Sequence, residues 1–131
     1  MTPAYVHRVA IRYGEVDMQG VVFNAHYLAF IDDGVDRWLR TLDVKFEDLG
    51  WDLMVKRADL QWQGSATVGE VLDVAMGVTR WGNTSFVVGV EVTVGARAVL
   101  TGDLTYVGVA PGTTETIPPP PEVKAKLSER L

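Results

Sequence analysis

The chain of 131 residues contains no cysteine. This absence excludes disulfides, thiolate metal ligands and a cysteine nucleophile, and it is compatible with a reducing compartment. Long hydrophobic runs are missing as well. No apolar stretch approaches the roughly 20 residues of a membrane-spanning helix, and the first residues lack the apolar segment of a signal peptide. The sequence therefore predicts a cytoplasmic protein that does not enter a membrane.

Positive charge is scarce, because 12 Lys and Arg residues stand against 17 Asp and Glu residues and leave a net charge of −5. Nucleic acids and anionic membranes need clustered cations, so neither is an expected partner. Motifs for a metal or a serine nucleophile are also lacking. His7 and His26 lie on different predicted elements, and no serine occupies a Gly-x-Ser-x-Gly turn. We expect neither a metal nor another cofactor.

The composition present is that of a folded protein, with 47% hydrophobic and 22% charged residues. Its length predicts a single domain over residues 1–131. Residues 5–13 alternate between two faces, with Tyr5, His7, Val9, Ile11 and Tyr13 on one of them, which is typical of a β-strand.

Residues 23–42 have the periodicity of a helix whose apolar arc can be buried. That arc holds Tyr27, Leu28, Ile31, Val35, Trp38, Leu39 and Leu42. Gly34 lies at its edge, where it would allow another element to approach closely. Asn24 is a candidate for the N-cap.

Four further strands are predicted after this helix, and the turns between them favour an antiparallel meander. Their bounds are 53–63, 71–81, 85–94 and 98–109. Prolines 118–121 interrupt regular structure, and a short helix is expected after them. Trp51, Trp62 and Trp81 are expected to fill the core or interfaces rather than to contact a ligand.

One long helix between a first strand and four others predicts an α+β fold in which a curled antiparallel sheet wraps around the helix. Such a single sheet has a second face and two edges to protect. We therefore expect a homodimer or a homotetramer.

The segment "EVDMQGVVFNAHY", residues 15–27, places the carboxylate of Asp17 shortly before the helix start, where backbone N–H groups are unpaired. Residues 12–40 resemble the signature of the 4-hydroxybenzoyl-CoA thioesterase family, which has the hotdog fold. The matching positions are Asp17, Gly20, Val21, Val22, Tyr27 and Leu28, followed by Trp38-Leu39. Asn24 and His26 depart from the residues that are common in the family, which leaves the substrate range open.

The resemblance implies an acyl-CoA thioesterase, which hydrolyses an acyl-CoA to a free acid and CoA. It implies that Asp17 is the nucleophile or the general base, and that the backbone N–H groups of Phe23, Asn24 and their neighbours stabilise the oxyanion. Gly20 would permit a close backbone approach. Val22, Tyr27 and Asp32 complete the predicted substrate-binding set, and Glu15 is predicted to be a turn or salt-bridge residue.

Two alternatives remain open from the sequence. The substrate acyl group could be attached to an acyl carrier protein, or the chain could be a non-catalytic hotdog module that binds acyl groups. Cations for the phosphates of CoA are not identified by any motif. Lys56, Arg57, Arg80 and Arg97 are candidates of equal weight.

Overall fold

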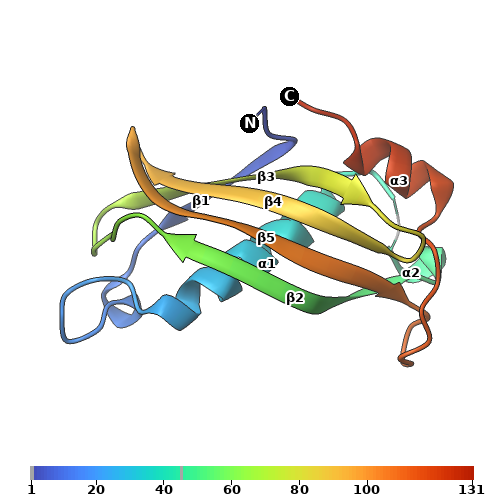
Figure 1. Cartoon of the computed structure of the whole chain (residues 1–131), viewed down its shortest axis with the longest axis horizontal. Coiled ribbons are helices and arrows are strands. Elements are labelled where there is room, and N and C mark those ends of the chain that lie inside the picture. The colour runs from blue at the N-terminus through green and yellow to red at the C-terminus, as the bar shows by residue number, and fades with distance from the viewer. Residues whose placement is uncertain (1, 45) are drawn as a thin grey trace.

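Five antiparallel strands form one curved sheet within residues 2–44 and 46–131, which the computed structural model describes (Figure 1). They are β1 (Tyr5–Ala10), β2 (Asp52–Trp62), β3 (Val71–Trp81), β4 (Ser85–Val94) and β5 (Arg97–Val109). Their order across the sheet is β1-β3-β4-β5-β2. The predicted bounds of the last four strands are thus confirmed to within one residue.

The long helix α1 (Asn24–Arg40) crosses one face of the sheet, behind the strands in the view of Figure 1. Three short helical segments accompany it: η1 (Tyr13–Glu15), α2 (Phe46–Leu49) and α3 (Pro121–Leu127). This arrangement confirms the predicted α+β hotdog architecture, a curled sheet around one central helix. The helix forms because its apolar residues recur on one side, which the sheet then covers.

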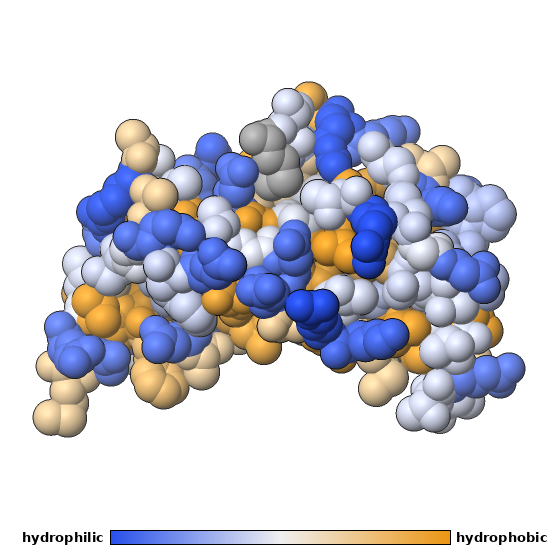
Figure 2. Space-filling view, viewed as in Figure 1, coloured by the Kyte–Doolittle hydropathy of each residue, from blue (hydrophilic) through white to orange (hydrophobic). Residues whose placement is uncertain are grey.

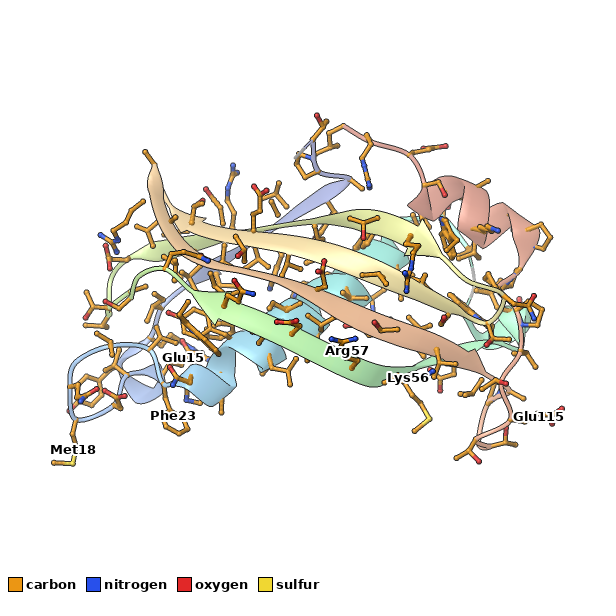
Figure 3. All side chains as sticks on the ribbon, viewed as in Figure 1. Glu15, Met18, Phe23, Lys56, Arg57 and Glu115 are labelled. Carbon is orange, nitrogen blue, oxygen red and sulfur yellow. The ribbon has the colours of Figure 1, made fainter. Side chains whose placement is uncertain are left out.

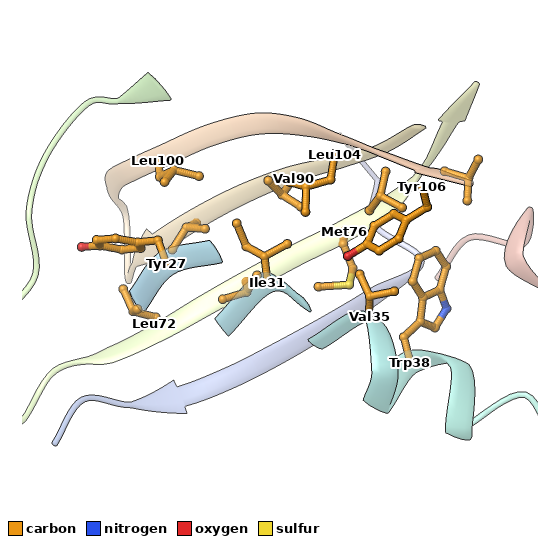
Figure 4. Close-up of a cluster of buried hydrophobic side chains, with 14 of the residues drawn as sticks. Tyr27, Ile31, Val35, Trp38, Leu72, Met76, Val90, Leu100, Leu104 and Tyr106 are labelled. Atoms are coloured by element: carbon orange, nitrogen blue, oxygen red, sulfur yellow. The ribbon is translucent and has the colours of Figure 1, made fainter. Parts of the chain in front are cut away.

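The core lies between α1 and the concave face of the sheet (Figure 4). Ile31 of the helix packs among side chains such as Met76 and Leu104, all of them fully buried. Gly34 confirms the expected close approach. A Cβ atom at this position would lie 2.7 Å from Cε of Met76 and 3.1 Å from Cβ of His7, so glycine lets α1 sit this close to β1 and β3 without displacing these side chains.

The predicted meander is wrong for β2, which pairs with β5 and not with β3. The strands from β3 to β5 do form hairpins, because Gly82 closes one turn with an N–H bond to Ser85 and Gly95 adopts the positive φ of the other. Residues 63–70 instead carry the chain from one edge of the sheet to β3. There β3 pairs with β1 on its other side, with Tyr5 opposite Met76.

Two local predictions are also wrong. The first strand ends at Ala10, and Tyr13 begins η1 with its side chain 83% exposed, because the Glu15 carboxylate captures the N–H of Arg12 and turns the chain. Phe23 and not Asn24 is the N-cap of α1. Its N–H donates to the carbonyl of Glu15, which holds Phe23 in an extended conformation.

The far end of the molecule is sealed by the C-terminal segment. Val123 and Leu127 of α3 are completely buried, and Trp81 donates its Nε1–H to Ser128. Arg130 bonds to the carbonyl of Val78, where β3 extends beyond the end of β1. The tail therefore protects the part of the β3 edge that no strand covers.

Candidate active site

Asp17 lies in a small hairpin between η1 and α1. The hairpin is closed by a bridge between Val16 and Val22 and by the bond from Asp17 N–H to the carbonyl of Val21, at 2.9 Å. Gly20 adopts a φ of +77°, which favours glycine, and donates its N–H to the carbonyl of Asp17 at 2.9 Å. The sequence Asp-x-x-Gly thus forms a defined turn that carries the carboxylate.

The carboxylate itself is half-buried. Its Oδ1 accepts the N–H of Gln19 at 2.8 Å. It faces an open depression of about 690 Å³ that Tyr13, Met18 and Val68 also line, all three with exposed side chains. Figure 3 shows Met18 at the tip of this loop, and Figure 2 shows apolar residues gathered at the same end of the molecule. An acidic group thus lies among exposed apolar side chains.

The N-terminus of α1 follows directly. Phe23 N–H is occupied by the Glu15 carbonyl at 3.1 Å, and His26 N–H turns back to the Phe23 carbonyl at 2.9 Å. Asn24 and Ala25 occupy the first two helical positions, whose N–H groups have no acceptor within a helix. They point out of the positive end of the helix dipole, where a developing negative charge is stabilised.

The structure brings the Asp17 loop and the helix start together through backbone bonds. The bond between Glu15 and Phe23 and the bridge between Val16 and Val22 both join the two sides. Val22 and Tyr27 lie deeper, each with only 2% of its surface exposed, so both side chains belong to the core. Their contact with a substrate stays a prediction.

Asp32 lies about two turns beyond Asn24 along α1. Its Oδ1 accepts the hydroxyl of Tyr106 at 2.9 Å, at the wall of a pocket of about 220 Å³ between α1 and β2. Val35, Leu39 and Leu53 give this pocket apolar surface. Burial, aided by the neighbouring Asp32 carboxylate, raises the pKa of Tyr106 far above its usual value, so the phenol remains a donor.

The predicted salt-bridge role of Glu15 is confirmed, since Arg12 donates to its Oε2 at 3.1 Å. This bond from Arg12 holds the pKa of the Glu15 carboxyl below its usual value although the side chain is only 10% exposed. Sequence reasoning missed Thr67, whose hydroxyl donates to the carbonyl of Gly20 at 2.6 Å. No local signal could have found this contact, because the two residues lie on separate loops.

The four candidate cations are not gathered in one place. Arg97 donates to both oxygens of Glu70 at 2.8 Å. Arg57 and Arg80 line one shallow depression on the outer face of the sheet, together with carboxylates.

Within the part of the chain that the structure describes, no group of three His, Asp or Glu side chains is placed to hold a metal ion. None of the described helices is long and apolar enough to cross a membrane.

The comparisons with known proteins agree with the observed fold. The family model of the thioesterase-like superfamily matches residues 11–127. No curated protein matches the chain in sequence. Among solved structures, a 1,4-dihydroxy-2-naphthoyl-CoA thioesterase from Synechocystis is similar with a TM-score of 0.83 at 16% identity, over 94% of each chain.

Two other solved structures are similar to this chain over most of its length. A gentisyl-coenzyme A thioesterase has a TM-score of 0.83 at 17% identity, over 94% of this chain and 99% of its own. A protein from Pseudomonas aeruginosa has a TM-score of 0.86 at 18% identity, over 96% and 90% of the two chains. At such identities the similarity establishes a shared fold.

Proposed function

The chain belongs to the thioesterase-like superfamily, and from this membership we propose that it hydrolyses an acyl-CoA to a free acid and CoA, as a member of the 4-hydroxybenzoyl-CoA thioesterase family. The observation that supports this activity most directly is the junction of the Asp17 loop with the N-terminus of α1. There a carboxylate and unpaired backbone N–H groups are tied together by the bond between Glu15 and Phe23. Thioester hydrolysis needs both kinds of group.

In the proposed reaction, the thioester carbonyl oxygen lies at the N–H groups of Asn24 and Ala25, while Phe23 keeps its N–H on Glu15. Asp17 then acts in one of two ways. As a base, it takes a proton from water, the hydroxide adds to the carbonyl carbon, the C–S bond breaks and the thiolate of CoA receives the proton. As a nucleophile, it displaces CoA itself, and water cleaves the resulting anhydride. The helix dipole stabilises the oxyanion in both cases.

We place the acyl group along α1, toward the pocket at Asp32. Asp32 lies eight residues beyond Asn24, which corresponds to about 12 Å along a helix. The walls combine apolar side chains such as Val35 and Leu39 with the hydrogen-bonded pair of Asp32 and Tyr106 and with two further carboxylates, Asp36 and Asp52. Such a lining suits a hydroxylated aromatic acyl group, and the two named similar structures act on naphthoyl and gentisyl thioesters.

We further propose that the enzyme is a cytoplasmic homo-oligomer that pairs through β2. This strand spans Asp52–Trp62 at an edge of the sheet and pairs on one side only, with β5. Met54, Val55 and Trp62 expose 42–47% of their surfaces along it. A long edge strand with exposed apolar side chains is suited to pairing with a second copy, which would also cover the pocket beside Val55.

The test is CoA release from a panel of aliphatic and aromatic acyl-CoAs, measured for the wild type and for Asp17→Asn. Asp73→Asn is the matched control, because Asp73 is a carboxylate on the outer sheet face that pairs with Arg8 at 3.0 Å. We expect turnover that Asp17→Asn lowers by at least about 100-fold and that the control preserves. Turnover of carrier-linked substrates alone would support the acyl carrier protein alternative. Tight acyl-CoA binding without any turnover would support a binding module.

A further inference from the structure

The Asp17 loop is held on two sides by contacts from outside it. On one side, Glu15 receives the N–H of Arg12 at 2.8 Å and its guanidinium at 3.1 Å, while the carbonyl of Glu15 receives Phe23 N–H. One buried residue thereby connects the end of β1, the start of the loop and the start of α1. Figure 3 shows Glu15 beside this helix start.

On the other side, the connection from β2 to β3 lies against the loop. Thr67 Oγ1 donates to the carbonyl of Gly20 at 2.6 Å, and Val22 N–H donates to the carbonyl of Ala66 at 2.9 Å. This connection is itself fixed by Glu70, which accepts the N–H of Thr67 at 2.9 Å and pairs with Arg97. On each side, therefore, a carboxylate that closes a tight turn and binds an arginine anchors the support, Glu15 on one side and Glu70 on the other.

We propose that Glu15 and Thr67 are positioning residues for the reaction, which hold the Asp17 carboxylate at the correct distance from the N–H groups of Asn24 and Ala25. This proposal rests on the proposed function. Neither residue exchanges a proton with the substrate. Each acts through the Asp17 loop, which has few buried side chains of its own and carries exposed Met18 at its tip.

The physical need for such supports follows from the exposure of the site. Asp17 is bonded within its own loop only through Gln19, Gly20 and Val21, so the hairpin could tilt as a unit. A misplacement of about 1 Å can lower a rate by roughly 100-fold. Bonds from rigid neighbours on both sides restrict that tilt, and the Glu15 carboxylate remains ionised because Arg12 lowers its pKa.

The first test is Glu15→Gln, which keeps the volume of the side chain but removes its charge. We expect kcat to fall roughly 10- to 100-fold, with KM changed by less than about twofold, because the thioester still binds while the carboxylate is misplaced. The acid limb of the pH profile should keep its apparent pKa. Loss of that limb, or an unchanged kcat, would overturn the proposal.

The second test is Thr67→Val, which replaces the hydroxyl with a methyl group that cannot donate to Gly20. Thr113→Val is the control, because Thr113 Oγ1 donates to the carbonyl of Ala110 at 2.7 Å and accepts the N–H of Glu115 at 3.1 Å, in a loop outside the proposed site. We expect Thr67→Val to lower kcat several-fold and the control variant to leave kcat unchanged. Equal effects of the two variants would mean that any lost loop bond acts through stability alone.

A third measurement separates positioning from general damage. In an Asp17→Asn background, Glu15→Gln should cause little further loss, since the group that it positions is already inactive. A full multiplicative loss would contradict the proposal. Val123→Ala, a core truncation in α3, serves as a control that lowers stability without touching the loop.

Amide hydrogen exchange tests the same supports without any substrate. We expect Glu15→Gln and Thr67→Val to speed exchange at the N–H groups of Asp17 and Gly20, and Thr113→Val to leave both unchanged. If the wild type hydrolyses no thioester, the proposed function fails while exchange still decides whether these contacts hold the loop. Unchanged exchange in both loop variants would overturn the inference, whatever the activity.

Discussion

The two ends of α1 differ in what holds them in place. At its N-terminus, backbone hydrogen bonds fix η1 and the Asp17 loop, where side chains such as Tyr13 and Met18 are exposed. At its C-terminal end, the sheet and α3 seal a core in which Phe86 stacks between Trp51 and Tyr106, at ring separations of 6.1 and 5.7 Å. The comparison teaches that one end supplies stability through packing, and that the other presents polar groups which packing would have buried.

The largest expected effect is on turnover, from a substitution of Asp17 at the N-terminal end of α1. Asp17→Asn should lower turnover by roughly 10²- to 10⁴-fold, the usual contribution of a general base. Its free energy of unfolding should stay within about 0.5 kcal/mol of the wild type, because Asp17 is partly exposed and, among the described residues, its hydrogen bonds lie within its own loop. Steady-state kinetics and urea unfolding measure the two quantities. A variant that is inactive only because it is unfolded would contradict this expectation.

At the C-terminal end of α1, a substitution is expected to lower stability and to leave turnover unchanged. Leu127→Ala in α3 truncates a completely buried side chain and should cost about 2–5 kcal/mol of unfolding free energy. Turnover per folded molecule should remain that of the wild type, since α3 lies at the opposite end of the helix from Asp17 (Figure 1). Activity measured well below the melting temperature, together with thermal unfolding, checks this. A fall in kcat with stability intact would mean that the ends are coupled.

The sequence predicts the packed part of the molecule better than the loop at the start of α1. Alternation and apolar periodicity gave the strands and α1, and Gly34 was expected to allow a close approach, because these features depend on local pattern and burial. The pairing of β2 with β5 was missed, since the same alternation suits either neighbour. The N-cap at Phe23 was missed because a carbonyl eight residues earlier, on Glu15, decides it.

The sequence predicted which residues belong to the candidate site, but not the contacts that hold them in place. A family motif identified Asp17 and Gly20, and the turn that joins them follows from Asp-x-x-Gly chemistry. The support from Thr67 depends on a bond across a sequence separation of 47 residues, for which a single sequence carries no signal. Tertiary hydrogen bonds to loops are therefore the part of a site that sequence reasoning misses first.

A smaller effect is expected midway along the helix, where α1 touches the sheet. Gly34→Ala should cost about 1–3 kcal/mol, because the new Cβ would overlap Cε of Met76 and press on His7. Gly14→Ala is the control, since no atom lies within 4 Å of a Cβ at that position. Urea unfolding of both variants measures the difference. Equal stabilities would mean that the Met76 side chain moves aside without cost.

The smallest expected effect concerns His7, at the same contact between α1 and β1. Burial lowers the pKa of His7; attraction to Asp33, whose Oδ2 lies 3.3 Å away, opposes this shift, and Arg37 adds to it. The unfolded chain, with a histidine pKa near 6.5, therefore binds a proton more readily than the folded chain. Stability should consequently be lost as the pH falls below about 6.5, by less than about 1.4 kcal/mol per pH unit. Urea unfolding of the wild type and of His7→Asn at several pH values between 7.5 and 5.5 isolates this contribution, because the carboxylates are common to both. An identical pH dependence in the two proteins would show that His7 accepts a proton as easily in the folded chain as in the unfolded chain. Burial between β1 and α1 would then not disfavour the charged form of the imidazole.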